Sequence, residues 1–183
     1  MDLTGKIIVS MPSLEDERFF KTVIYICAHS SEGSMGIIIN KKIDYDLYPD
    51  LLEQLGIDKP LDNKKLFIRY GGPVESGRGF VLHSDDIIRK ETLNIDKGVA
   101  LTSTAEFFDD LSLGKGPKNS ILALGYAGWG PGQLEDEIIK NSWMTLSVDT
   151  SFIFDEEVSR KWTEAYKIMG VDPNNLSFQS GRA

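Results

Sequence analysis

A glycine-rich turn is the first place in this sequence where chemistry could be built. GWGPGQ, residues 128–133, follows an apolar run and precedes a predicted helix. Such a turn can bind phosphate through the free amides of a helix N-terminus. Here Glu135, Asp136 and Glu137 occupy the first helical turns, where they already interact with the helix dipole and would repel an anion. We interpret the turn mainly as a scaffold that uses glycine for its geometry, with a peptide or neutral-ligand groove as the second interpretation.

The two histidines are the next candidates for chemistry. Cys27 and His29 are two residues apart on a predicted strand, so they should share a face, but a separation of about 7 Å is too long for a nucleophile–base hydrogen bond. His83 ends another strand, beside Ser84 and two aspartates. The histidines could meet across the sheet and bind a metal. The absence of H-x-x-x-H or H-x-H spacing favours strand-end hydrogen bonds instead.

An arginine completes the set of candidate residues. Arg78, between two glycines, could bind a carboxylate of a ligand or, as we favour, one of the 28 acidic side chains of the chain itself. The sequence has neither a P-loop nor the G-x-S-x-G elbow of a serine hydrolase. We therefore assign no catalytic residue, no metal site and no cofactor. The candidate binding residues are Trp129, Gly130, Gly132, His29, Arg78 and His83.

Short β-branched and aromatic runs predict the strands that must position these residues. The predicted strands are residues 6–9, 22–29, 36–40, 65–72, 78–84, 92–95, 98–103, 120–127 and 142–148. The short loops between neighbours indicate antiparallel pairing, and 71–77 is predicted to be a glycine-proline turn. The run 120–127 does not alternate, which predicts a central strand buried on both faces.

Apolar spacing and end signals predict helices among these strands. One covers 48–56, a second begins at a capping box in 103–106 and ends at Gly114, and a third covers 131–141. The longest is predicted over 155–170. Its buried face contains Val158, Trp162, Ala165 and Met169. Residues 171–183 are predicted to form a loose tail. The mixed order of elements indicates one α+β domain over residues 1–183.

Composition and charge limit the classes of function. The 20 basic and 28 acidic side chains give a formal net charge of −8, and the basic clusters are only pairs. Direct nucleic-acid binding is therefore not expected, because it depends on lysine and arginine contacts to phosphates. The chain has one cysteine, and we find neither a signal-peptide pattern nor an apolar run that could span a membrane. These features predict a cytoplasmic protein without membrane contact.

Five segments in order resemble the YqgE/AlgH family of bacterial proteins. They are MPSLEDERFFKTVIYICAH, GSMGIIIN, RYGGPVESGRGFVLH, GVALTSTAEFFDDLSLGKGP and LALGYAGWGPGQLEDEIIKNSWMTL, and the resemblance covers about residues 3–170. It implies an α+β fold of bent, largely antiparallel sheets, partly barrel-like, with helices packed outside. The family supplies no established catalytic residue or cofactor, and one branch is associated with transcriptional regulation. This chain departs from the usual pattern at Ala28, where relatives commonly have an acidic residue.

Two hypotheses for function remain open. The leading one is a non-enzymatic regulatory or interaction domain that presents a surface to a protein or peptide partner and could act on transcription through it. The alternative is an enzyme or small-ligand binder that uses a groove bordered by the GWGPG turn, His29, Arg78 and His83. The hypotheses differ in whether these four segments converge on one concave pocket.

Overall fold

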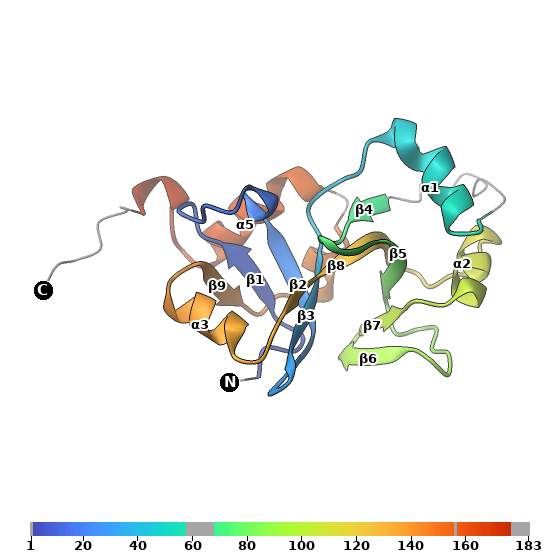
Figure 1. The fold of residues 1–183 in the computed structure, drawn as a ribbon, viewed down its shortest axis with the longest axis horizontal. Coiled ribbons are helices and arrows are strands. Elements are labelled where there is room, and N and C mark those ends of the chain that lie inside the picture. The colour runs from blue at the N-terminus through green and yellow to red at the C-terminus, as the bar shows by residue number, and fades with distance from the viewer. Residues whose placement is uncertain (1, 58–67, 156, 177–183) are drawn as a thin grey trace, which may run out of the picture.

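The computed structural model describes residues 2–57, 68–155 and 157–176 and shows an α+β fold built on a nine-stranded sheet (Figure 1). The strand order is β6-β7-β5-β8-β3-β2-β1-β9, and β4 pairs with β8 beside this path. The strands are β1 (Ile7–Ser10), β2 (Val23–Ser30), β3 (Gly33–Ile38), β4 (Ile68–Tyr70), β5 (Val74–His83), β6 (Leu93–Asp96), β7 (Val99–Thr102), β8 (Ser120–Trp129) and β9 (Trp143–Leu146). The predicted α+β class is confirmed, although the sheet is open rather than closed into a barrel.

Helices lie at both ends of the molecule (Figure 1). They are α1 (Tyr48–Gln54), α2 (Ala105–Ser112), α3 (Gln133–Ile139), α4 (Thr150–Phe154) and α5 (Lys161–Ile168), with 3₁₀ turns η1 (Glu17–Phe19), η2 (Tyr45–Leu47), η3 (Val158–Arg160) and η4 (Pro173–Asn175). The helix predicted over 155–170 is divided into η3 and α5. No helix was expected at α4, because its five residues are too few for a helical period to be recognised.

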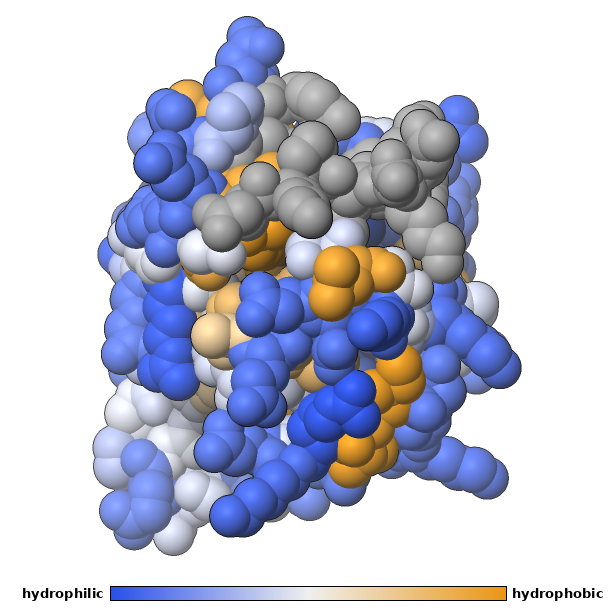
Figure 2. Space-filling view, turned by 90° about the vertical axis from the view of Figure 1, so that its right-hand side faces the viewer, coloured by the Kyte–Doolittle hydropathy of each residue, from blue (hydrophilic) through white to orange (hydrophobic). Residues whose placement is uncertain are grey.

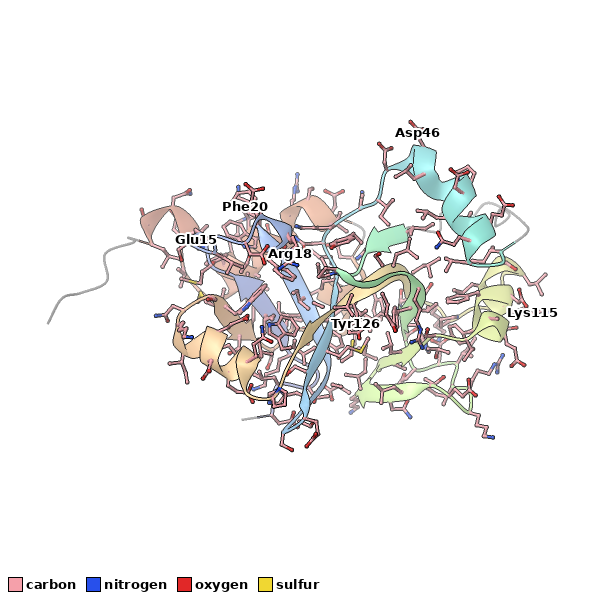
Figure 3. All side chains as sticks on the ribbon, viewed as in Figure 1. Glu15, Arg18, Phe20, Asp46, Lys115 and Tyr126 are labelled. Carbon is pink, nitrogen blue, oxygen red and sulfur yellow. The ribbon has the colours of Figure 1, made fainter. Side chains whose placement is uncertain are left out.

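The β8 strand is the centre of the sheet. Its first half lies between β5, which is antiparallel to it, and β4, which is parallel. Its last three residues pair with β3. Leu122 and Leu124 are 0% and 4% exposed, so the prediction of a buried central strand is confirmed. In Figure 3, Tyr126 of β8 lies near the middle of the molecule, whereas Asp46 and Lys115 lie at its edges.

Three apolar clusters occupy the two faces of the sheet. One face carries a single large cluster, which α4 and α5 cover with Ile153, Trp162, Ala165 and Tyr166. The other face is divided: one cluster includes Leu134 of α3, and another includes Phe107, Phe108 and Leu111 of α2, with leucines of α1 packed against it. Alternate strand residues enter opposite faces, which explains why Ile121 and Leu122 belong to different clusters.

Two local predictions were wrong. Residues 74–77 belong to β5 rather than to a turn, and an irregularity in the β5–β8 register between Val74 and Gly79 accommodates them. The predicted capping box does not form, because α2 begins after Thr104, which makes no side-chain cap bond. The Ser103 hydroxyl instead donates to the Gly79 carbonyl oxygen at 2.7 Å.

Residues 65–67 of a predicted strand and 177–183 of the predicted tail lie outside the described residues.

A close backbone approach fixes the point where β8 changes partners. The Gly71 amide donates to the Leu124 carbonyl at 2.8 Å, and the Gly71 carbonyl accepts from the Ile38 amide at 2.9 Å. Gly71 therefore joins β8 to β3. Beside it, Gly125 has a φ of +71°, and a Cβ there would overlap the Gly72 carbonyl oxygen. Glycine is needed at this position both for the backbone conformation and for the contact.

We predict that Gly125→Ala lowers the free energy of unfolding by about 2–4 kcal/mol, because it adds a steric overlap to the roughly 1 kcal/mol cost of a left-handed alanine. Gly114→Ala is the matched control: Gly114 has a φ of +69°, but a Cβ added there would have nothing within 4 Å. Urea denaturation of both variants measures the difference. Equal losses for the two variants would contradict the close approach.

Candidate functional site

The GWGPG turn, residues 128–132, includes the end of β8 and leads into α3. The strand continues through Trp129, two residues further than predicted. Gly132 has a φ of +70°, whereas Gly128 and Gly130 do not have a positive φ. A Cβ at Gly130 would come no closer than 3.9 Å to the side-chain oxygen of Gln133. Of the two predicted binding glycines, Gly132 is therefore the one whose conformation requires glycine.

Glu137 of α3 attaches this turn to the body of the protein. Its Oε2 accepts hydrogen bonds from the indole Nε1 of Trp129 at 2.9 Å and of Trp143 at 2.8 Å. Its Oε1 accepts from Gln133, whose own side-chain oxygen accepts from the Gly130 amide. The two tryptophans are only 7% and 3% exposed, so one carboxylate satisfies two buried donors. These contacts support the interpretation of the turn as a scaffold.

His29 lies beside this turn, between a serine and a glutamate. Its Nδ1 is 2.8 Å from Ser34 Oγ, and its Nε2 is 3.5 Å from Glu135 Oε1. A serine, a histidine and a carboxylate in this order are the groups of a hydrolase triad. However, Ser34 is buried within β3, and 3.5 Å is longer than a typical hydrogen bond to a carboxylate. We interpret the three side chains as a link between the β2–β3 hairpin and α3.

Cys27 does not share a face with His29, contrary to the prediction. The β2–β3 register shifts between Ile26 and Ala28, which reverses the alternation of side chains beyond this point. Cys27 consequently belongs to the large cluster on the α5 side, whereas His29 contacts Ser34 and Glu135 on the α3 side. Burial raises the pKa of the Cys27 thiol, as expected for a small apolar core residue.

The other two predicted binding residues lie on β5, and their contacts differ from those of the turn. Arg78 forms an ion pair with Glu75 at 3.0 Å and donates to Ser103, so it binds an acidic residue of its own chain, as favoured. His83 is fully buried and stacks at 4.6 Å on the ring of Phe107. The structure thus brings His29 to the GWGPG turn, while Arg78 and His83 have separate surroundings. A ligand-binding role for these residues remains a prediction.

The surroundings of His83 suit a neutral ring. Its Nδ1 donates to the Ser84 carbonyl oxygen at 2.9 Å, which leaves Nε2 to accept from the Thr102 hydroxyl at 2.8 Å. That hydroxyl is also 2.8 Å from the Thr92 hydroxyl. Burial lowers the pKa of His83, although the Ser84 carbonyl and the nearby Asp85 and Asp86 act in the opposite direction. The histidine therefore has the strand-end hydrogen bonds that were predicted for it.

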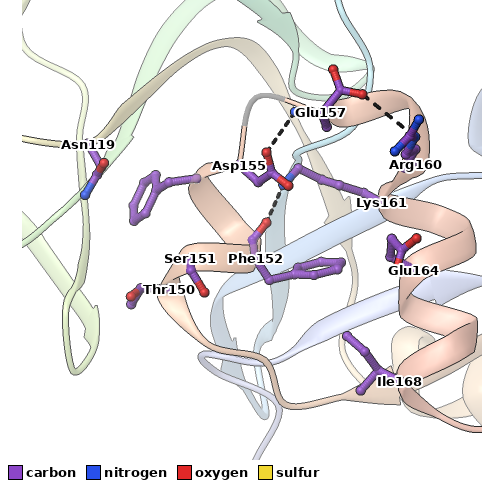
Figure 4. Close-up of a pocket in the computed structure, with 11 residues that line it drawn as sticks. Asn119, Thr150, Ser151, Phe152, Asp155, Glu157, Arg160, Lys161, Glu164 and Ile168 are labelled. Carbon is purple, nitrogen blue, oxygen red and sulfur yellow. Dashed lines mark hydrogen bonds and ion pairs between the residues drawn. The ribbon is translucent and has the colours of Figure 1, made fainter.

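A cavity beside α4 and α5 was not predicted from the sequence. We call it the Lys161 cavity; its volume is about 820 Å³ and it is open to solvent (Figure 4). It is lined by Asn119, Thr150, Ser151, Phe152, Phe154, Asp155, Glu157, Arg160, Lys161, Glu164 and Ile168. This volume is within the range of small-molecule sites, which are typically about 300–1,000 Å³.

Lys161 is the unusual residue in this cavity, because it is a lysine only 2% exposed. Its ammonium group donates a hydrogen bond to the Phe152 carbonyl oxygen and lies 5.0 Å from the centre of the Phe152 ring. Burial lowers the pKa of Lys161 to about 8, and the positive charge of Arg69 acts in the same direction, whereas Asp155 acts against it. The amine is therefore closer to neutrality at physiological pH than an ordinary lysine.

Arg69 of β4 provides a second buried cation near this amine. It is 2% exposed, and its Nη1 and Nη2 donate to the backbone carbonyl oxygens of Ile39 at 2.6 Å and of Asp155 at 3.4 Å. The guanidinium thus ties the segment after α4 to the end of β3. A charge buried at this depth is costly unless it has such hydrogen bonds.

Sequence reasoning missed Lys161 although its spacing contains a signal. It lies three residues after Val158 and four before Ala165, so it borders the apolar face that was correctly predicted. A lysine at the edge of a buried helical face usually extends its ammonium group to water. Only the tertiary structure shows that this one remains buried. Arg69 carries no comparable signal, because the pairing of β4 with β8 was not predicted.

Metal ligation and membrane crossing find no support in the described part of the chain. Residues 2–57, 68–155 and 157–176 contain no group of three histidine, cysteine, aspartate or glutamate side chains placed to hold a metal ion. In the same ranges, none of the helices has the length and apolar character needed to cross a bilayer.

We predict that Glu137→Ala lowers the free energy of unfolding by about 2–4 kcal/mol, because it leaves two buried indole N–H groups without their acceptor. Asp136→Ala, at an exposed position of the same helix, is the control and should change stability by less than about 1 kcal/mol. Denaturant unfolding measures both. A loss for Glu137→Ala no larger than that of the control would show that the carboxylate does not hold the turn.

We also predict that the stability difference between the natural chain and Lys161→Met depends on pH. The folded lysine loses its proton near pH 8, but the unfolded one near 10.5, so the unfolded state binds more protons between these values. The free energy of unfolding of the natural chain should therefore rise by up to about 3 kcal/mol relative to Lys161→Met across this window. Lys167→Met, at an exposed ion-paired position, should show no such rise. A pH-independent difference for Lys161→Met would refute the lowered pKa.

Comparison of the chain with known proteins identifies a family that it matches. The model of the AlgH-like family, DUF179, matches residues 7–174. A UPF0301 protein of Nitrobacter hamburgensis is 49% identical over 99% of this chain and 88% of its own length. A second UPF0301 protein, from Jannaschia sp., is 46% identical over 100% of this chain and 96% of its own.

Solved structures agree with the sequence matches. The solution structure of the AlgH protein from Pseudomonas aeruginosa aligns with a TM-score of 0.81 and 34% identity, covering 100% of this chain and 97% of that one. The crystal structure of protein DIP2367 from Corynebacterium diphtheriae has a TM-score of 0.70 over 92% of this chain and 87% of its own. At 19% identity, the second match shows a shared fold alone. From the family match over most of its length and the identity to its relatives, the chain belongs to the AlgH-like family, also described as UPF0301.

Proposed function

We propose that this chain is a cytoplasmic regulatory protein that acts on transcription through a protein partner rather than by contacting DNA. The observation that carries the proposal is the state of its arginines. Each of the five arginines in the described ranges either forms an ion pair with an acidic side chain of the same chain or is buried. Arginine contacts to phosphate need guanidinium groups that are exposed and free to bind an anion.

The paired arginines lie on separate elements of the fold: η1, β5, the loop before β6 and η3. Arg18 pairs with Asp16 at 2.7 Å, Arg89 with Asp110 at 2.7 Å, and Arg78 with Glu75 at 3.0 Å. Arg160 lies 3.9 Å from Glu157, and Arg69 is buried. Exposed pairs of this kind contribute little to stability. Each ion pair neutralises the positive charge of its arginine locally, and the net charge of the chain is already −8.

The surface also offers apolar groups that a protein partner could cover. Figure 2 shows the face that carries α1, α2, β6 and β7, where apolar side chains lie among charged ones. Leu113 at the end of α2 is 57% exposed, and Ile88 in the loop before β6 is 44% exposed. Protein interfaces combine apolar groups and charged rims in this way.

Small-ligand binding is the second candidate function, and the Lys161 cavity favours it. The Lys161 cavity is open, has a volume of about 820 Å³, and is lined by aromatic, hydroxyl and charged groups. This position differs from the groove predicted at the GWGPG turn. Such a ligand could also regulate a protein partner, so the two candidates are compatible.

We predict that the chain shows no saturable binding to labelled genomic DNA fragments at about 150 mM salt, because its net charge is −8 and the arginines of the described ranges are paired or buried, whereas strong DNA binders make about 6–10 phosphate contacts. In parallel, cross-linking of the tagged chain in cells should recover a protein of the transcription machinery, and nuclease treatment should not release it. Submicromolar saturable DNA binding, or a partner recovered only while nucleic acid is intact, would overturn the proposal. Failure to recover any transcription protein would also count against it.

A further inference from the structure

The Lys161 cavity combines an apolar wall with a buried amine. Phe152, Phe154 and Ile168 supply apolar surface, and Thr150 and Ser151 supply hydroxyl groups. Figure 4 shows the Lys161 side chain extending from α5 toward the Asp155 side chain and the Phe152 carbonyl. A small molecule with an apolar body and one reactive polar group would therefore find both kinds of surface in the same cavity.

The charges in the cavity wall argue against an anionic ligand. Three carboxylates, those of Asp155, Glu157 and Glu164, line the cavity with two cations, Arg160 and Lys161. Arg160 is already 3.9 Å from Glu157. An incoming carboxylate or phosphate would approach more negative than positive groups. The cavity is better suited to a ligand without net charge.

The amine is held in a defined position at this cavity. Its hydrogen bond to the Phe152 carbonyl links α5 to α4, and its ring contact is with the side chain of the same residue. The charged groups that act on it are Arg69 from β4 and Asp155 from the segment after α4. Desolvation and a neighbouring cation, here Arg69, are the two conditions by which proteins make a lysine nucleophilic.

We propose that Lys161 forms an imine with a small neutral aldehyde that enters this cavity. The nitrogen lone pair attacks the carbonyl carbon, and a proton passes from nitrogen to the former carbonyl oxygen through the solvent of the open cavity. The resulting hydroxyl group takes the second proton of the nitrogen and leaves as water when the carbon–nitrogen double bond forms. Amine and aldehyde thus give imine and water without any oxidant or reductant. This proposal is independent of the protein partner proposed above.

The titration of the amine supports this chemistry, because only the neutral form is nucleophilic. With a pKa of about 8 in place of 10.5, the neutral fraction of Lys161 near pH 7.4 is about 250-fold larger than that of an ordinary lysine. Desolvation, Arg69 and Asp155 together determine this value. Access is the second requirement: Lys161 lines the open cavity, but its side chain is only 2% exposed, so an aldehyde has to reach the amine from the cavity side.

The test is reductive labelling of the full chain with benzaldehyde and sodium cyanoborohydride, followed by peptide mass spectrometry. Reduction converts an imine to a stable secondary amine, so each labelled lysine can be located. We expect Lys161 to be labelled at least about tenfold faster than Lys167, with a rate that rises with pH to a plateau above its pKa of about 8. Glyoxylate, an anionic aldehyde, should label Lys161 more slowly than benzaldehyde does.

Two variants make the result specific. Lys161→Arg should remove the fast site, whereas Lys167→Arg should keep it, with circular dichroism confirming that each variant is folded. The measurement on the natural chain decides the proposal even if Lys161→Arg does not fold. Labelling of Lys161 no faster than that of Lys167, or only after denaturation, would overturn the proposal. Faster labelling by glyoxylate would overturn the choice of a neutral ligand.

Discussion

The backbone junction at Gly71, Gly72 and Gly125 is the constraint on which the rest of this fold depends. Gly71 donates to β8 and accepts from β3, and Gly125 allows β8 to pass close to Gly72. Because backbone atoms meet here without side chains between them, one strand can serve both halves of the sheet. The first half of β8 pairs with β4 and β5, and its end pairs with β3.

The division of the core follows from this junction. One face of the sheet keeps a continuous apolar cluster under α4 and α5, and the other face is separated into a cluster beneath α3 and a cluster beneath α1 and α2. The helices therefore cover the sheet in three groups: α4 with α5, α3 alone, and α1 with α2. The GWGPG turn lies at the end of β8, so its geometry is set by the strand before it and by the Glu137 contacts that hold the helix after it.

Much of the fold could be predicted from the sequence, because local patterns determine most of its elements. The β-branched and aromatic residues of 22–29, the unbroken apolar run 120–127 and the glycine stop at 114 each depend on near neighbours. The errors have non-local causes. A register shift after Ile26 separates Cys27 from His29, and the Gly79 carbonyl engages Ser103 in place of the predicted cap. Neither event has a signal in the adjacent sequence.

The candidate site was harder to predict than the fold for a physical reason. A lysine at the border of an apolar helical face has the same sequence pattern whether its ammonium group reaches water or remains buried. What decides the outcome here is the packing of α4 against α5 and the presence of Arg69 from a strand about 90 residues earlier in the chain. Two cations buried close together oppose folding, and backbone carbonyl oxygens offset only part of that cost. An apolar side chain would pack at position 161 without this penalty. The lysine therefore has a structural disadvantage that a chemical role for its amine would explain.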